Sequence, residues 1–201
     1  MNAAADLAMR EGAAQKPGEL ADFFDWLSGR DPLRTIVEIG TLRGGTLAAW
    51  CAIAEPDARI VSIDLPGGRW GGGYAESDEP RLRALAQPGQ ELTLIRGDSH
   101  AILTIVRLEE ILGEDEIDML FIDGDHSEAG ALEDYSDYGS LVRRGGVIAF
   151  HDILPHPNVP GCDVDQAWRQ IAADHEHVEF TDPGDTHPEW GQWGGIGALI
   201  V

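Results

Sequence analysis

The chain has 201 residues, of which 43% are hydrophobic, so it is long and apolar enough to bury the core of one domain. Its 14 basic side chains stand against 36 acidic ones, a formal charge of −22, which argues against nucleic acid or an anionic membrane surface as a partner. Since no segment approaches the roughly 18 apolar residues of a membrane span, we expect a soluble cytoplasmic protein with a single domain over residues 1–201.

Helices are predicted in the N-terminal segment, residues 1–33, ahead of the first strand. Short runs rich in β-branched residues then alternate with helix-length stretches, at residues 35–39, 59–64, 91–96, 117–123 and 146–150. Beyond them we expect a helix near 164–173, a short run at 177–180 and a final strand over 196–201. Strands that alternate with helices of this length form right-handed crossovers around a parallel sheet covered on both faces. The predicted fold class is therefore α/β.

A glycine-rich turn follows the first predicted strand. Glu38 lies near the end of that strand, and Gly40, Thr41 and Gly44 follow it. Glycines let the backbone pass close to a ligand, and the helix that comes next offers free N–H groups at its N-terminus. The order of the glycines differs from the G-x-G-x-x-G fingerprint of dinucleotide-binding proteins.

Polar residues also follow the second and third predicted strands. Asp64 ends the second strand, where a carboxylate can accept hydrogen bonds from both hydroxyls of a ribose. Asp98 and Ser99 follow the third strand, in a position that borders a base. Each residue taken singly is explained by a turn or a helix cap. Because ligands bind beyond the carboxyl ends of such strands, the residues together favour a nucleoside cofactor.

The segments VEIGTLRGGT, SIDLPGG, RGDSH, FIDGDH and LVRRGGVIAFHDI resemble the class I S-adenosylmethionine-dependent methyltransferases over roughly residues 34–201. Within that class the chain is most similar to the macrocin and rhamnosyl O-methyltransferases and the cephalosporin hydroxylase-like proteins. The resemblance implies a Rossmann-like, doubly wound sheet of seven strands, mostly parallel with a reversed C-terminal strand. It also implies S-adenosylmethionine as the cofactor, with these binding residues: Glu38, Gly40, Thr41, Gly44, Asp64, Asp98, Ser99 and Asp123.

Three residues, one of them Asp123, form a predicted metal site. Asp123 ends the fourth predicted strand, and His151 and Asp152 follow the fifth, so the side chains can meet at neighbouring strand ends. Two carboxylates and an imidazole suit a divalent ion, and Mg²⁺ is the default for an open, oxygen-rich site. The resemblance to catechol-type O-methyltransferases agrees, although those relatives have no histidine at the position of His151. That difference leaves open both the identity of the metal and a reaction without metal.

His126 is the first candidate for the catalytic base. It lies three residues beyond Asp123, where catechol-type relatives carry a basic residue, and an imidazole suits proton transfer at neutral pH. His151 is the alternative base if it binds no metal, and Asp125 is interpreted as a helix cap. Weaker candidates are His100, which could touch the cofactor, His156 in a proline-flanked loop, and the predicted surface residues His175, His177 and His187.

Two other groups of residues carry open interpretations. Trp70 and Tyr74, with Trp190 and Trp193, form either an aromatic wall over the acceptor or the packing of glycine-rich loops. The two cysteines are interpreted as inert thiols, because their spacing suggests neither a metal knuckle nor a disulfide: Cys51 and Cys162.

Taken together, the sequence predicts methyl transfer from S-adenosylmethionine to a hydroxyl of a small molecule, a sugar or phenolic unit of a secondary metabolite, with help from a metal. One alternative is a nicotinamide-dependent oxidoreductase on the same type of sheet, which the order of the glycines disfavours. Another is a catalytically idle cofactor-binding protein. The sequence leaves the acceptor and the formation of a homo-oligomer open.

Overall fold

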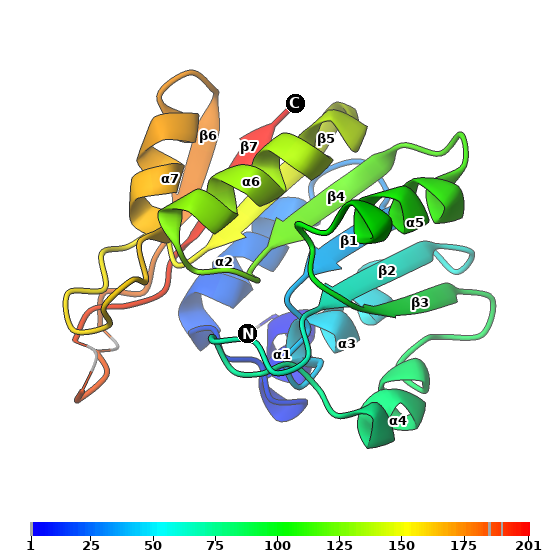
Figure 1. Cartoon of the computed structure of the whole chain (residues 1–201), viewed down its shortest axis with the longest axis horizontal. Coiled ribbons are helices and arrows are strands. Elements are labelled where there is room, and N and C mark those ends of the chain that lie inside the picture. The colour runs from blue at the N-terminus through cyan, green and yellow to red at the C-terminus, as the bar shows by residue number, and fades with distance from the viewer. Residues whose placement is uncertain (1, 185, 190) are drawn as a thin grey trace.

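The computed structural model describes residues 2–184, 186–189 and 191–201. Within this part of the chain the strands form a seven-stranded sheet in the order β3-β2-β1-β4-β5-β7-β6 (Figure 1). The strands are β1 (Thr35–Ile39), β2 (Arg59–Asp64), β3 (Glu91–Arg96), β4 (Ile117–Ile122), β5 (Val142–His151), β6 (His177–Phe180) and β7 (Ile196–Ile200). The pairs among β1 to β5 are parallel, whereas β7 runs antiparallel to both β5 and β6. The structure therefore confirms the expected α/β sheet with a reversed C-terminal strand.

Helices cover both faces of the sheet. Behind the sheet in Figure 1 lie α1 (Ala3–Arg10), α2 (Pro17–Leu27) and α3 (Gly45–Ile53), and in front of it lie α5 (Ile102–Leu112), α6 (Glu128–Tyr138) and α7 (Val164–Ala172). A short helix, α4 (Glu79–Arg83), precedes β3. Every residue of β1 and β4 is buried, because the sheet is covered on both sides. Alternate residues of these strands enter two hydrophobic clusters, one on each face.

The bounds of β4 and β5 differ from the sequence expectation, and β7 ends one residue earlier than expected, at Ile200. The structure ends β4 at Ile122, so Asp123 lies just beyond the strand and not inside it. It extends β5 from Val142 to His151, because His151 still pairs with Ile196 of β7. The sequence pattern did not reveal that β5 starts at Val142, because Gly145 and Gly146 interrupt the apolar run. Gly145 has φ +79°.

The predicted N-terminal helices are present and reach the carboxyl ends of the strands. The side chain of Asn2 caps α1 by accepting hydrogen bonds from two backbone N–H groups. Pro17 starts α2, and Glu19 accepts a hydrogen bond from the N–H of Lys16, the residue that precedes the helix. Helix α1 packs on α3, and α2 contacts β6 and β7. The connection between α1 and α2 is thereby held close to the loops that follow the strands.

No helix in the described ranges is long and apolar enough to cross a membrane.

Candidate active site

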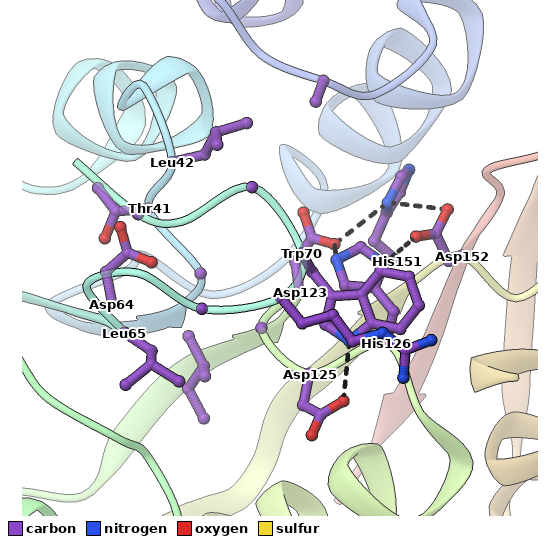
Figure 2. Close-up of a pocket in the computed structure, with 18 of the residues that line it drawn as sticks. Thr41, Leu42, Asp64, Leu65, Trp70, Asp123, Asp125, His126, His151 and Asp152 are labelled. Atoms are coloured by element: carbon purple, nitrogen blue, oxygen red, sulfur yellow. Dashed lines mark hydrogen bonds and ion pairs between the residues drawn. The ribbon is translucent and has the colours of Figure 1, made fainter. Parts of the chain in front are cut away.

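A cavity of about 650 Å³ opens at the carboxyl ends of the central strands. Its wall includes the glycine turn after β1 and the loops that follow β2, β3, β4 and β5. The order of the strands reverses between β1 and β4, and ligands of doubly wound sheets bind at such a switch point. A cavity of this size can enclose a nucleoside cofactor together with a small acceptor. Figure 2 shows Thr41 and Asp64 on one side of the view and His126, His151 and Asp152 on the other.

Asp64 forms part of the first side of the cavity. Its carboxylate accepts a hydrogen bond from the backbone N–H of Tyr74 at 3.1 Å. Burial raises the pKa of Asp64 above its ordinary value, while the backbone N–H groups of Tyr74, Thr41 and Leu42 act in the opposite direction. A Cβ on Gly73, which has φ +65°, would lie 3.0 Å from the Asp64 carboxylate. The loop therefore needs glycine where it passes the carboxylate that was predicted to bind ribose.

Glu38 lies beneath the glycine turn, outside the wall of the cavity. Its fully buried carboxylate accepts hydrogen bonds from Thr46 Oγ1 at 2.5 Å, Trp50 Nε1 at 3.1 Å and Ser62 Oγ at 2.7 Å. Burial raises the pKa of Glu38 to about 7. The geometry gives Glu38 a role in holding the turn, and direct contact with a cofactor stays a prediction.

Gly44 is also absent from the cavity wall. It has φ +82°, and a Cβ there would approach the Leu82 side chain to 2.3 Å. Six of the eight predicted cofactor residues do line the cavity: Gly40, Thr41, Asp64, Asp98, Ser99 and Asp123.

His100 lies beside the first side of the cavity, together with Asp98 and Ser99. Its Nε2 is 3.1 Å from Asp134 Oδ1, and the side chain of Asp134 is fully buried. The hydrogen bond with Asp134 raises the pKa of His100 to about 9. His100 is thus held by α6, and its predicted contact with the cofactor stays a prediction.

The three predicted metal-binding residues meet on the other side of the cavity. His151 Nδ1 lies 3.2 Å from Asp123 Oδ1 and 3.3 Å from Asp152 Oδ1. One potential ligand atom of each residue lies within 4.8 Å of the other two. Asp152 has φ +60°, an uncommon conformation for a residue other than glycine. That conformation is found where the chain leaves β5 and turns the carboxylate toward the cluster.

The other nitrogen of His151 faces a buried carboxylate from α2. His151 Nε2 lies 2.9 Å from Glu19 Oε1, and Glu19 also accepts backbone hydrogen bonds from Lys16 at 2.9 Å and Gly195 at 2.6 Å. Because a carboxylate only accepts, the imidazole donates its Nε2 proton to Glu19 and turns Nδ1 toward Asp123 and Asp152. In the ion-free protein a proton on Nδ1 supplies the positive charge between the imidazole and the two carboxylates, and a divalent ion that replaced this proton would fit the same donor set.

The charges in this group shift the pKa values of both His151 and Asp152. Although burial lowers the pKa of His151, the charges of Asp152 and Asp123 hold it well above its ordinary value. Burial opposes ionisation of Asp152, yet the charge of His151 and the hydrogen bond to His126 keep the pKa of Asp152 well below its ordinary value. The cluster is thus arranged for positive charge beside ionised carboxylates.

Gln15 joins the cluster from the connection between α1 and α2. Its Nε2 donates a hydrogen bond to Asp123 Oδ2 at 2.6 Å. Its Oε1 is buried and has no hydrogen-bond partner among the described residues, although the side chain lines the cavity. An unpaired buried acceptor at a cavity wall offers a position for a ligand donor. Neither Gln15 nor Glu19 carries a local sequence signal, since their partners lie 108 and 132 residues away.

His126 faces Asp152 across the cavity edge. Its Nδ1 lies 2.5 Å from Asp152 Oδ2, and its Nε2 lies 3.9 Å from Asp123 Oδ1. Burial lowers the pKa of His126, but the hydrogen bond with Asp152 outweighs this and raises it to about 10. The ring of Trp70 lies over the imidazole with 5.2 Å between ring centroids (Figure 2). Without a second cation near Asp152, the imidazole is therefore protonated at neutral pH.

Asp125 supports this arrangement and is not part of the potential metal cluster. Its Oδ1 accepts hydrogen bonds from Ser127 N at 2.9 Å and Trp70 Nε1 at 3.2 Å. Ser127, and not Asp125, is the N-cap of α6. The predicted capping role is therefore shifted by two residues, and Asp125 fixes both the cap residue and the indole above His126.

Besides Gln15 and Glu19, the site includes two residues of the loop after β5 to which the sequence interpretation gave no role. His156 Nε2 lies 3.1 Å from Asp152 Oδ1, and the thiol of Cys162 hydrogen-bonds both His126 and His156. Burial opposes ionisation of Cys162, but these two hydrogen bonds lower the pKa of the thiol. Both residues line the cavity, because the proline-rich loop after β5 folds back over the strand ends. The expectation that Cys162 is an inert thiol is thus corrected.

The predicted aromatic wall is only partly present. Trp70 and Trp193 line the cavity, whereas Tyr74 is buried and absent from its wall. The fourth residue of the prediction, Trp190, lies outside the described residues.

Comparison with known proteins places these features among methyltransferases. Residues 37–153, more than half of the chain, match a family model described as a methyltransferase domain. No curated protein matches the sequence.

Solved structures of O-methyltransferases share the fold. TomG from Streptomyces achromogenes, which is involved in tomaymycin synthesis, was solved with S-adenosylmethionine. Its sequence is 22% identical and its TM-score is 0.63, and the match covers 100% of this chain and 91% of TomG. An O-methyltransferase from Bacillus cereus, solved with S-adenosylhomocysteine, is 18% identical with a TM-score of 0.64, and the match covers 100% of this chain and 92% of that enzyme. MycE of the mycinamycin biosynthetic pathway, solved with Mg, S-adenosylhomocysteine and mycinamycin VI, is 18% identical with a TM-score of 0.62, and the match covers 98% of this chain and 54% of MycE.

Proposed function

The chain belongs to the methyltransferase-domain family, and from that membership we propose that it transfers the methyl group of S-adenosylmethionine to a hydroxyl of a small molecule. The observation that carries the proposal is one continuous cavity with Asp64 and the glycine turn on one side and Asp123, His126 and Asp152 on the other. We propose a sugar or phenolic unit of a secondary metabolite as the acceptor. Support comes from TomG and MycE, whose names connect them with tomaymycin and mycinamycin biosynthesis.

The first side of the cavity suits the nucleoside cofactor. The Asp64 carboxylate would accept hydrogen bonds from ribose hydroxyls, and Asp98 and Ser99 would border the adenine. Gly40 has φ +97°, so a residue with a side chain would be strained where the turn lines the cavity. The unpaired Oε1 of Gln15 is available to a donor group of the bound cofactor or acceptor. When bound, S-adenosylmethionine supplies a methyl group that its sulfonium has already activated.

A divalent ion, with Mg²⁺ as the first candidate, would be held by Asp123, His151 and Asp152. When bound, the ion would align the acceptor and screen the negative charge that develops on its oxygen. The buried Glu19 carboxylate keeps the proton of His151 on Nε2, which leaves Nδ1 to face the ion. His151 is therefore a better candidate for metal binding than for the base.

His126 is the proposed base. Asp152 orients its Nδ1, which leaves Nε2 to receive the proton of the acceptor hydroxyl. With a pKa of about 10 the imidazole would already carry that proton at neutral pH. Positive charge that compensates Asp152 lowers the pKa of His126 toward the range in which it can act as a base. In this proposal the metal and the base therefore depend on one another through Asp152.

A direct test combines binding with turnover. Calorimetric titrations with S-adenosylhomocysteine and with NAD compare the proposed cofactor with that of an oxidoreductase. A panel of hydroxylated acceptors, incubated with a methyl-labelled donor and Mg²⁺, then tests the transfer. We expect S-adenosylhomocysteine alone to bind and label to enter at least one acceptor. Binding of NAD alone would overturn the proposal, and S-adenosylhomocysteine binding without transfer to any acceptor would favour an idle cofactor-binding protein.

A further inference from the structure

A second group of potential metal ligands overlaps the proposed catalytic site. It consists of His126 from the loop after β4, Asp152 from the end of β5 and Cys162 from the loop before α7. One ligand atom of each lies within 4.8 Å of the other two. His156 lies beside this group as a potential fourth donor, since its Nε2 is 3.1 Å from Asp152 Oδ1 and it hydrogen-bonds the Cys162 thiol. To bind an ion, this Nε2 would give up its hydrogen bond with Gly194 N at 3.2 Å.

The chemistry of these four side chains differs from that of the oxygen-rich cluster. A thiolate and two imidazoles are ligands of Zn²⁺ and similar ions, whereas Mg²⁺ prefers oxygen. We propose that His126, Asp152, His156 and Cys162 form a second site, which binds a thiophilic divalent ion such as Zn²⁺. Cys51, the other cysteine, is buried in α3 and is absent from the cavity wall.

The local structure is suited to hold such a site. The side chains are largely shielded, with exposed fractions of 20% for His126, 7% for Asp152 and 5% for His156. A backbone hydrogen bond from Asp163 N to His126 O, 2.8 Å long, ties the loop of Cys162 to the loop of His126. All four residues line the cavity, so an ion can enter through it. Binding displaces the proton of the Cys162 thiol and one proton from each of the His126 and His156 imidazolium groups, and these protons pass to solvent.

The two groups of ligands share one carboxylate. Asp152 Oδ2 faces His126 at 2.5 Å, whereas Oδ1 lies 3.3 Å from His151 and 3.1 Å from His156. An imidazole that binds an ion through one nitrogen carries its single proton on the other and has no lone pair left for a substrate proton. If His126 is the base, as proposed above, Zn²⁺ in the second site therefore inhibits methyl transfer.

Binding of Co²⁺ provides a test that does not depend on turnover. Cobalt adopts the ligand geometry of zinc, and a thiolate ligand gives it a sulfur-to-metal charge-transfer absorption. We expect this absorption in the wild type, in Cys51→Ser and in Asp123→Asn, which alters only the oxygen-rich cluster. Cys162→Ser should lose it, and His156→Gln should weaken Co²⁺ binding by about tenfold or more. Excess Mg²⁺ should leave the absorption unchanged.

Absence of the thiolate absorption in the folded wild type, or its survival in Cys162→Ser, would overturn the second site. Folding of each variant is checked by its binding of S-adenosylhomocysteine. Inhibition is measured separately: we expect Cys162→Ser to need about tenfold more Zn²⁺ for half-inhibition, while Cys51→Ser behaves as wild type. Equal Zn²⁺ sensitivity of both variants would overturn the inhibitory role. A cobalt signal in a protein that transfers no methyl group would uphold the site and count against the proposed function.

Discussion

Glu19 Oε1 lies 2.9 Å from His151 Nε2, and 132 residues of sequence separate the two buried side chains. Glu19 belongs to α2, outside residues 37–153 that match the methyltransferase-domain family. The N-terminal part of the chain thus sets the orientation of an imidazole at the end of β5. A carboxylate that holds the remote nitrogen of a metal-binding histidine raises the basicity of the nitrogen that faces the metal.

Glu19→Gln should weaken the binding of Mg²⁺ or Mn²⁺ by about tenfold to a hundredfold, because the amide cannot hold the imidazole as a carboxylate does. Calorimetric titration of the metal measures the effect. Asp22→Asn, an exposed change in the same helix, is the matched control and should bind metal as the wild type does. Unchanged affinity in folded Glu19→Gln would remove Glu19 from this role.

Asp64→Ala should weaken the binding of S-adenosylhomocysteine by about 1 to 3 kcal/mol, since hydrogen bonds between a carboxylate and the ribose are lost. Isothermal calorimetry provides the measurement. The control is Asp57→Ala, which removes an exposed carboxylate that forms a surface ion pair with Arg34 at 3.5 Å. If both variants bind the cofactor equally well, Asp64 does not contact the ribose.

Chelation should abolish most turnover and leave the affinity for S-adenosylhomocysteine nearly intact, because the proposed ion serves the acceptor and not the nucleoside. Asp152→Ala should reproduce both results, and added Mg²⁺ should restore only the chelated wild type. Turnover and cofactor binding are measured on the same samples. Full turnover in excess chelator, from protein without detectable metal, would contradict a metal-assisted reaction.

His126→Ala should lower kcat by about a hundredfold or more, with little change in cofactor affinity. The pH profile identifies the group: a base loses activity as pH falls below its pKa, which in the ion-free protein is about 10 for His126. Compensation of Asp152 by Mg²⁺ should move this acidic limb toward neutral pH. A variant that keeps both the rate and the limb would show that His126 is not the base.

Stability should fall as pH rises through about 7, because the buried carboxyl of Glu38 has a raised pKa. The folded protein binds this proton more tightly than the unfolded chain, so the contribution is complete below pH 4.5 and is lost as Glu38 ionises near pH 7. The shift corresponds to about 3 kcal/mol of unfolding free energy. Urea unfolding across this range should show the dependence in the wild type, and Glu38→Gln should lose it. An unchanged slope in the variant would place the effect elsewhere.

The residues that could be predicted from the sequence are those whose position follows from the parallel sheet itself. Asp64, Asp123 and His151 lie at strand ends, and the fold brings those ends together whatever the loops do. Glu38 was also found, but its burial beneath the turn was not, because a strand pattern does not reveal whether a carboxylate faces a cavity or a helix.

Tertiary packing, which no local sequence pattern predicts, places the other residues at the site. Gln15 and Glu19 reach the strand ends because α1 packs on α3 and α2 packs beside β7. His156 and Cys162 come from an irregular loop, whose path depends on long-range contacts. Because the proline residues of that loop indicate irregular structure, the sequence did not predict that His156 and Cys162 belong to the cavity wall.

The hydrogen bond from Gly195 N to Glu19 joins residues 176 positions apart. During synthesis, a ribosome releases α2 and the first five strands long before residue 195 emerges from it. A nascent chain can thus pair β1 to β5 while the carboxylate behind His151 still lacks one of its anchors. The last anchor of Glu19 is therefore added only after β5 and its terminal His151 have been synthesised, so the support of this imidazole is completed late in synthesis.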